Sequence, residues 1–96
     1  MKRSFKFSKQ FKKDYRKIEK SGKLNIEKLK KVMQKLMDGH SLESSYEDHE
    51  LKGGWKGYRD CHVEGDWLLI YKIVPHSNGL ETVIFSRTGN HSNLFK

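Results

Sequence analysis

The spacing of the apolar residues changes once along the chain, and this change constrains the fold more than any other feature of the sequence. Between residues 9 and 38, apolar residues recur every three or four positions, which is the period of an amphipathic helix. Between residues 58 and 86 they alternate or run continuously, which is typical of β-strands. The sequence therefore predicts helices followed by strands, an α+β fold.

Two helices are expected in the first part of the chain. Ser8 and Asn25 are polar residues of the kind that cap helix N-termini, and they precede helical patterns over residues 9–21 and 26–38. A glycine follows each pattern, as is common after the last turn of a helix. Because only a few residues separate the two helices, we expect them to form an antiparallel pair.

Four strands complete the expected fold. Residues 3–7 alternate between polar and apolar and suit a short first strand. After the helices, residues 58–63 alternate, residues 67–74 are nearly all apolar as in a central strand, and residues 80–86 form a last strand. The residues from 87 onward form a short polar tail. The order β-α-α-β-β-β predicts an antiparallel sheet packed against the two N-terminal helices.

The size of the chain fits a single domain over residues 1–96. Cys61 is the only cysteine, so an internal disulfide is excluded. No apolar run approaches the ~20 residues that cross a membrane, and the basic start of the sequence lacks the apolar segment of a signal peptide. We therefore expect a cytoplasmic protein without a membrane partner.

Positive charge is concentrated in the first part of the chain. The formal charge is +8 overall, but residues 1–40 hold 14 basic and four acidic residues, a local charge of +10. Such a concentration is typical of a surface that binds a polyanion such as RNA. Lysines on a helix can also serve only to keep its outer face in water. The candidate RNA contacts on the first helix are Lys9, Lys12, Lys13 and Arg16.

The second part of the chain supplies side chains suited to cutting RNA. In metal-free cleavage the 2′-OH of the RNA attacks the phosphate, a base removes its proton, and an acid protonates the departing oxygen. Histidine suits both proton transfers because its ordinary pKa of about 6.5 lies near working pH. Arginine suits the phosphate because it donates paired hydrogen bonds, and aromatic residues, Phe95 among them, can stack on bases. The candidate residues for proton transfer and phosphate binding are His49, His62, Asp66, Arg87 and His91.

Other interpretations of the same residues remain open at this point. His62 can be a hydrogen-bonded strand residue, and Asp66 a turn residue. Arg87 can pair with Glu64 or Glu81. Three histidines and an aspartate are also acceptable zinc ligands, but their spacing matches no compact zinc signature. We therefore expect neither a metal nor another cofactor.

Two segments of the chain resemble the YafQ toxins of the RelE superfamily. They are the run from Asp48 to Lys72, which contains Lys-Gly-Tyr-Arg-Asp around Tyr58, and the run from Arg87 to Phe95. The resemblance covers most of residues 46–96, whereas the first 40 residues match only in pattern. It implies a RelE-like, microbial-ribonuclease-like fold with an antiparallel sheet on helices.

The resemblance also implies a function and a partner. Toxins of this family cleave mRNA in the A site of the 70S ribosome and leave a 2′,3′-cyclic phosphate and a 5′-hydroxyl. Each is encoded beside an acidic antitoxin of the DinJ or RelB type. Contact with DNA is expected only indirectly, through the complex with the antitoxin.

By resemblance, the site residues are the catalytic His49, His62, Asp66 and His91, the phosphate-binding Arg87 and the terminal aromatic Phe95. We expect His91 to act as the general acid and Asp66 or His49 as the general base. His62 then orients a partner or contacts the phosphate. Position 65 is glycine in this chain, where the family often has proline, so the turn before Asp66 is expected to differ.

Two alternatives to a ribosome-dependent mRNA endonuclease follow from the same residues. One is a non-catalytic module that blocks translation by binding RNA or the ribosome, and the other is a free ribonuclease. Three histidines favour an enzyme, because RNA binding needs lysine and arginine but has little use for histidine.

Overall fold

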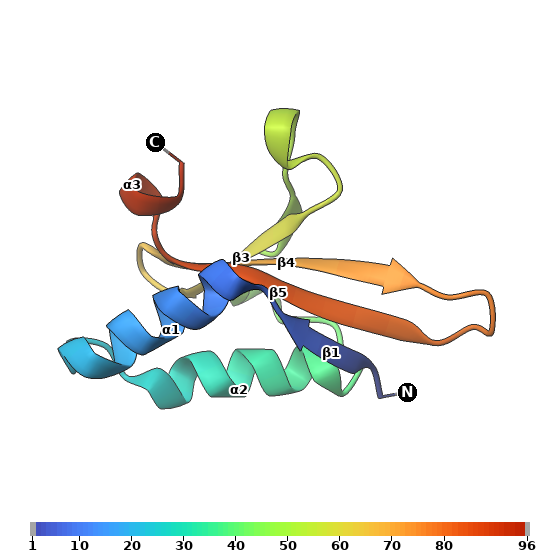
Figure 1. Cartoon of the computed structure of the whole chain (residues 1–96), viewed down its shortest axis with the longest axis horizontal. Helices are drawn as coiled ribbons and strands as arrows, with labels where there is room; N and C mark the ends of the chain where they lie inside the picture. The colour runs from blue at the N-terminus through green and yellow to red at the C-terminus, as the bar shows by residue number, and fades with distance from the viewer. Residues whose placement is uncertain (1, 96) are drawn as a thin grey trace.

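A five-stranded sheet with helices on both of its faces forms the body of the protein (Figure 1). The structure is a computed structural model, and it describes residues 2–95. The strands lie side by side in the order β1-β5-β4-β3-β2. Along the chain the elements are β1 (Ser4–Phe7), α1 (Lys9–Ser21), α2 (Ile26–Met37), η1 (Ser44–Tyr46), β2 (His49–Glu50), η2 (Gly53–Trp55), β3 (Arg59–Glu64), β4 (Trp67–Pro75), β5 (Glu81–Asn90) and α3 (His91–Leu94).

The first two helices begin and end within one residue of the predicted positions. The hydroxyl of Ser8 accepts a hydrogen bond from the backbone N–H of Phe11 at 2.9 Å, and Gly22 takes the left-handed conformation that ends α1. Asn25 caps α2 through its side chain, and α2 ends at Met37. The short connection reverses the chain, so α1 and α2 run in opposite directions, as predicted (Figure 1).

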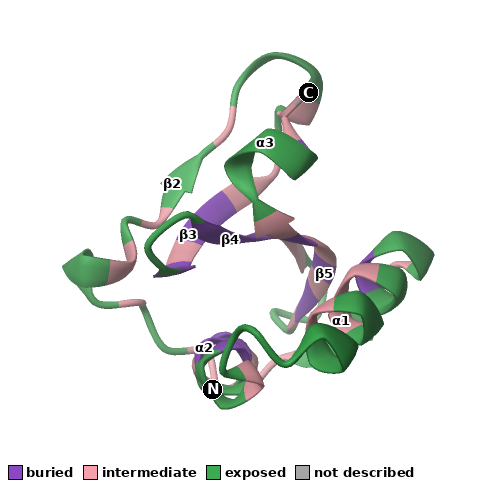
Figure 2. Ribbon diagram, turned by 90° about the vertical axis from the view of Figure 1, so that its left-hand side faces the viewer, coloured by how far each residue is buried: buried purple, intermediate pink, exposed green. Residues whose placement is uncertain are grey.

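The sheet lies between the first two helices and the C-terminal helix α3 (His91–Leu94). β4 lies at its centre, paired antiparallel with β3 and β5. β1 pairs parallel with β5, so the sheet is antiparallel except at that edge. α2 covers one face of the sheet, α1 lies beside β5 on the same side, and α3 lies over the opposite face (Figure 2). This arrangement confirms the predicted α+β fold.

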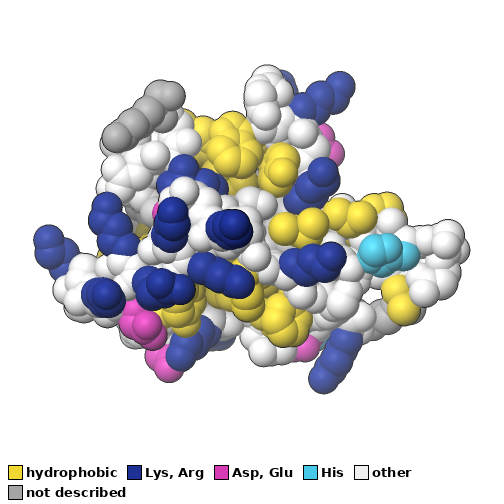
Figure 3. All heavy atoms as spheres, in the orientation of Figure 1, with side chains coloured by type: hydrophobic (Ala, Val, Ile, Leu, Met, Phe, Trp, Pro, Cys, Tyr) yellow, Lys and Arg dark blue, Asp and Glu magenta, His cyan; other side chains and the backbone are white. Residues whose placement is uncertain are grey.

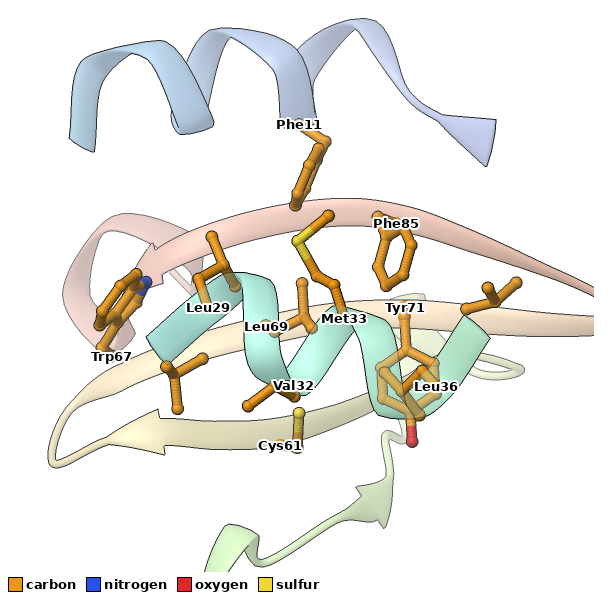
Figure 4. Close-up of a cluster of buried hydrophobic side chains, with 12 residues drawn as sticks. Phe11, Leu29, Val32, Met33, Leu36, Cys61, Trp67, Leu69, Tyr71 and Phe85 are labelled. Carbon is orange, nitrogen blue, oxygen red and sulfur yellow. The ribbon is translucent and has the colours of Figure 1, made fainter. Parts of the chain in front are cut away.

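The main core fills the space between the sheet and the first two helices (Figure 4). Cys61 and Val63 of β3 belong to this core. Trp67 is 3% exposed and belongs to this core, so it is a packing residue rather than a platform for RNA bases. The other buried members are Phe11, Leu29, Val32, Met33, Leu36, Leu69, Tyr71, Val83 and Phe85. Among residues 2–95, no helix is both long and apolar enough to cross a membrane.

A smaller apolar cluster lies on the opposite face of the sheet and fastens α3 there. Leu94 is 6% exposed and packs on Leu68 and Ile70 of β4. This packing anchors the C-terminal segment to the sheet. The partly buried residues around the cluster are Leu51, Trp55, Tyr58 and Phe95.

The structure differs from the prediction in two places. β5 extends to Asn90, whereas the sequence pattern ended the last strand earlier and began a polar tail. The buried Thr88 explains the extra length, because its hydroxyl accepts from the indole N–H of Trp67 and donates to the carbonyl of Leu68, each at 2.9 Å. Residues 40–50, where the sequence pattern indicated neither a helix nor a strand, contain the short edge strand β2.

Candidate active site

The two faces of β3 differ in chemistry. Cys61 and Val63 point into the main core, and Asp60 and His62, which alternate with them, face the side that α3 covers. Asp60 is 4% exposed, and its Oδ1 accepts no well-aligned hydrogen bond from any residue in the range 2–95. A buried carboxylate oxygen in this state is unusual in a folded protein and points to a functional role.

Three histidines lie close enough to this carboxylate to influence its pKa. Burial is the largest influence on the pKa of Asp60 and raises it, while positive charge on His49, His62 or His91 lowers it. These histidines come from β2, β3 and the start of α3. The structure therefore gathers the three histidines nominated by the sequence around an aspartate that was not nominated. Across residues 2–95, no three His, Cys, Asp or Glu side chains are arranged to hold a metal ion.

The ring of His49 has an acceptor at each nitrogen. His49 lies opposite Asp60 in the antiparallel pair of β2 and β3. Its Nδ1 lies 2.8 Å from the carbonyl oxygen of Glu47, which can only accept, so Nδ1 donates. Its Nε2 lies 3.1 Å from Oδ1 of Asp60, an ion-pair distance. An oxygen therefore faces each nitrogen of this ring.

His62 has one nitrogen engaged and one available. Its Nδ1 lies 3.0 Å from the carbonyl oxygen of Gly65 and therefore donates, which leaves a lone pair on Nε2. Gly65 is the first residue of the two-residue turn between β3 and β4, and its φ of 53° suits glycine. Proline cannot adopt this φ, so the turn differs from one built on proline, as the sequence led us to expect.

His91 and Asp66 meet where α3 begins. The backbone N–H of His91 points to Oδ1 of Asp66 at 3.4 Å. Asn90 caps the helix by accepting a hydrogen bond from the N–H of Asn93 at 2.8 Å. The centroids of the His91 and Phe95 rings lie 4.8 Å apart. Asp66 and Phe95 therefore both contact the element that carries the third histidine.

Arg87 is bound to a carboxylate on α1. Its Nε and Nη2 donate to the two oxygens of Asp14 at 3.0 and 3.1 Å. The pairing with Glu64 or Glu81 considered from the sequence is wrong, because each of those carboxylates pairs with a lysine or arginine from another part of the chain. Arg87 and Asp66 line the same cleft, of about 770 Å³, between α1 and the end of β5.

The basic residues of α1 spread around the helix. All four candidate RNA contacts are exposed, and lysine and arginine side chains cover the side of the molecule where α1 lies (Figure 3). Lys13 lines the cleft with Arg87, whereas Lys12 and Arg16 line a separate groove beside α2. Lys9 is the first residue of the helix. Only part of the predicted RNA-binding set therefore borders the cleft.

Three residues that contact the nominated side chains were not predicted from the sequence. Asp60 had a visible signal, because it lies two residues before His62 on a strand and so shares its face. Asp14 holds Arg87 across the boundary between helix and sheet, and no sequence spacing points to that contact. Glu47 contacts His49 through a backbone conformation that the sequence does not reveal.

Comparison with known proteins identifies relatives over the whole chain. The family model described as the bacterial toxin of type II toxin–antitoxin system, YafQ, matches residues 3–96. The mRNA interferase toxin YafQ of Escherichia coli strain K12 is 43% identical over 94 residues, which cover 97% of this chain and 96% of that protein.

Two solved structures have the same fold at similar levels of identity. A chain of the E. coli DinJ–YafQ toxin–antitoxin complex is 42% identical, with a TM-score of 0.83 over 100% of both chains. A metal-bound toxin from Helicobacter pylori is 38% identical, with a TM-score of 0.82 over 99% of this chain and 100% of that chain. The sequence and the fold agree with the resemblance predicted from the second part of the chain, and the chain belongs to the YafQ family of toxins from bacterial type II toxin–antitoxin systems.

Proposed function

We propose that this chain is an mRNA interferase that cleaves mRNA in the A site of the ribosome by attack of the RNA 2′-OH, without a metal ion. The observation that carries the proposal is the group of three histidines around the buried Asp60. Cleavage of this kind leaves a 2′,3′-cyclic phosphate and a 5′-hydroxyl, and it needs one group to remove a proton and another to donate one. The E. coli relative, at 43% identity, is an mRNA interferase toxin, which supports the same reaction here.

His91 is proposed as the general acid. Its side chain is exposed at the start of α3, next to the ring of Phe95. A histidine can hold a proton near neutral pH and pass it to the departing 5′-oxygen. The carboxylate of Asp66 faces the backbone N–H of His91, so Asp66 also helps to position the acid.

Two groups meet the requirements of the general base. Nε2 of His62 has a lone pair because Nδ1 of the same ring donates to a carbonyl. The carboxylate of Asp66 is exposed and lines the cleft. His49 is the weaker candidate, because oxygens face both of its nitrogens. We therefore assign His49, paired with Asp60, to stabilising negative charge on the phosphate.

The RNA is proposed to reach the site along the cleft between α1 and β5. Lys13 and Arg87 line this cleft, and the bidentate contact with Asp14 orients the guanidinium of Arg87 in advance. Phe95, beside the ring of His91, is proposed to stack on a base. The remaining basic side chains of α1 add general attraction for RNA on the ribosome; they are Lys9, Lys12 and Arg16.

The proposed protein partner is an acidic antitoxin of the DinJ or RelB type. A structural relative at 42% identity belongs to the E. coli DinJ–YafQ complex. The local charge of +10 over residues 1–40 suits an acidic segment of such a partner. DNA is proposed to be contacted only through the resulting complex.

Single-turnover cleavage on programmed ribosomes with saturating toxin tests the catalytic assignments. We expect His91→Ala to slow cleavage by a factor of ~10²–10⁴, with ribosome affinity and thermal stability unchanged. Asp66→Asn should also slow cleavage and keep the fold. His40→Ala is the matched control, because His40 is exposed and outside the site. Cleavage by His91→Ala at the wild-type rate would remove His91 from the mechanism.

Mapping of RNA ends in cells that express the protein separates the proposed activity from its alternatives. Cuts at discrete in-frame positions of translated mRNA are the expected result. Cuts scattered over untranslated RNA would indicate a free ribonuclease. Inhibited translation without new RNA ends would indicate a non-catalytic module that binds the ribosome.

Elemental analysis of the purified protein tests the metal-free part of the proposal. A metal-bound structural relative from H. pylori makes a bound metal the specific alternative. We expect an active preparation to contain metal well below one equivalent per chain. Stoichiometric zinc in the wild type that is lost in His62→Ala would contradict the metal-free mechanism.

A further inference from the structure

Glu47 has an unusual backbone conformation beside the site. Its φ of 49° places it in the left-handed region, and among residues 2–95 no other residue except glycine has a positive φ. Left-handed conformations are sterically unfavourable for residues with a Cβ atom, and they cluster at sites where the backbone has a function. Glu47 directly follows η1 and comes two residues before His49.

The peptide of Glu47 contacts the candidate site directly. Its carbonyl oxygen accepts a hydrogen bond from Nδ1 of His49 at 2.8 Å. Its carboxylate lies 3.7 Å from Nδ1 of His62. One residue thus faces two of the three histidines that surround Asp60. The Glu47 side chain is 68% exposed, so packing in a core does not explain the conformation.

Hydrogen bonds on both sides of Glu47 hold it in place. Its backbone N–H donates to the carbonyl of Ser44 at 3.0 Å. The next residue, Asp48, accepts from Nε of Arg59 at 3.2 Å and from the buried hydroxyl of Tyr71 at 2.5 Å. A strained conformation persists when the surrounding structure determines it from several directions, and Glu47 meets that condition.

We propose that Glu47 is a positioning residue whose left-handed backbone aims its carbonyl at His49. This contact keeps a proton on Nδ1 of His49 and turns Nε2 toward Asp60. In a right-handed or extended conformation the same carbonyl would point in another direction, and His49 would lose its acceptor. The catalytic meaning of the contact depends on the proposed function, whereas the contact itself can be measured without cleavage.

Three substitutions separate the backbone conformation from the side chain. Glu47→Gly permits the left-handed conformation without strain and removes the carboxylate. Glu47→Val strongly disfavours that conformation. Glu47→Gln keeps the length of the side chain and removes only its charge. We expect Glu47→Val to cleave about tenfold more slowly than Glu47→Gly in single-turnover reactions, and Glu47→Gln measures the contribution of the carboxylate separately. Ribosome affinity should be the same for all four proteins.

Nitrogen NMR of the histidine rings reads out the contact directly in the full-length protein. We expect His49, once neutral, to carry its proton on Nδ1 in the wild type and in Glu47→Gly, and to lose this preference in Glu47→Val. The His49→Gln variant assigns the signal, and the amide spectrum shows that each variant is folded.

Two results would overturn the proposal. One is a wild-type His49 that is protonated on Nε2 when neutral. The other is a folded Glu47→Val protein whose His49 tautomer and cleavage rate are those of the wild type. If Glu47→Val does not fold, Glu47→Ala takes its place. We then expect a smaller decrease in the cleavage rate and a partial loss of the preference for a proton on Nδ1 of His49. If the wild type does not cleave RNA at all, the proposed function fails, while the tautomer measurement still decides the role of Glu47.

Discussion

At the scale of single residues, Asp60 determines the charge balance of the candidate site. Its carboxylate is 4% exposed, and positive charge on His49, His62 and His91 lowers its pKa. Burial disfavours the ionised form and outweighs the three histidines, so the pKa of Asp60 is raised. Ionisation of the buried Asp60 therefore destabilises the folded state.

This balance predicts opposite effects of Asp60→Asn on stability and on cleavage. Because the folded state raises the pKa of Asp60, wild-type stability should fall as pH rises through that pKa, and the asparagine variant should lack this loss. The free energy of unfolding of the variant, relative to the wild type, should therefore increase between about pH 4 and pH 7. Urea unfolding at several pH values measures it, and a relative stability that is constant or falls over this range would contradict the argument.

The same substitution should slow cleavage. Asparagine removes the negative charge that faces Nε2 of His49, so we expect a decrease of at least about tenfold, smaller than the factor of ~10²–10⁴ for an acid–base group itself. Single-turnover rates compared with those of His91→Ala provide the measurement. A variant that is more stable and equally active would show that Asp60 has no catalytic importance.

Side-chain chemistry made the candidate reacting residues easier to predict than the residues that contact them. His49, His62 and His91 stand out in the sequence because few side chains can exchange protons near neutral pH. Asp60 and Asp14 look like ordinary surface carboxylates, and their roles appear only when strands pair and a helix packs on the sheet. Asp60 shares a strand face with His62, which is a weak local signal, whereas no spacing in the sequence points to the contact of Asp14 with Arg87.

At the scale of elements, the direct passage from β5 into α3 places the proposed acid. β5 shifts its register with β4 between Ile70 and Tyr71, which marks a bulge, and then continues to Asn90. His91 follows at once as the first residue of α3, and Leu94 fastens this helix to the sheet. The position of the His91 side chain therefore depends on the last part of β5 being paired.

Thr88 is predicted to be important for the stability of this paired segment. Thr88→Val keeps the shape of the side chain but leaves the buried indole N–H of Trp67 without its acceptor, which should lower the free energy of unfolding by ~1–3 kcal/mol. Thr88→Ser is the matched control, because it restores the hydroxyl. Urea unfolding of both variants gives the comparison, and equal stability of Thr88→Val and the wild type would show that the hydrogen bond contributes nothing.

Phe95 is predicted to act on the substrate rather than on the fold. Its ring is only partly buried and lies beside the ring of His91, so a base can stack on it, an interaction worth ~1–3 kcal/mol in other single-strand binders. Phe95→Ala should slow cleavage on ribosomes less than His91→Ala does, and thermal stability should change little. Leu80→Ala, at an exposed apolar position in the β4–β5 loop, is the control. A large fall in melting temperature would make Phe95 a structural anchor instead.

The elements themselves were predicted where the pattern is periodic and missed where it is not. Ser8 and Asn25 cap the helices as expected because capping is a local interaction. The end of β5 was missed because Thr88, Gly89 and Asn90 have the composition of a loop. They belong to the sheet because their backbone pairs with the first residues of β4. A single sequence does not show which strands pair.

At the scale of the whole molecule, the basic residues and the candidate catalytic histidines lie in different regions. The basic residues are concentrated in the helical first part (Figure 3), whereas the histidines that influence Asp60 come from β2, β3 and the start of α3. The ion pair of Arg87 and Asp14 joins the two regions at the edge of the cleft. Substitutions on the helices can therefore change the attraction for RNA or for an antitoxin without altering the histidines.

This separation predicts how an acidic antitoxin should associate. Charge attraction between the +10 segment and an acidic partner raises the association rate, and salt screens it, so the rate should fall from low to physiological ionic strength. Lys12→Gln combined with Arg16→Gln should lower the rate at low salt, whereas Lys56→Gln, an exposed lysine outside this segment, should have a smaller effect. Stopped-flow measurements of the association rate at several salt concentrations test this prediction. An association rate that does not change with salt would exclude this electrostatic role.

The parallel pairing of β1 with β5 has a consequence for the order of folding. It joins Ser4 to Thr82, which are 78 positions apart, whereas β3, β4 and β5 are joined by short turns. Closing a long loop loses more chain entropy than closing a short one, so we expect the three-stranded meander to form first and β1 to dock late. Contacts made after the rate-limiting step affect the unfolding rate alone. Substitutions in β1 should therefore shorten the lifetime of the folded toxin while leaving the speed of its folding unchanged.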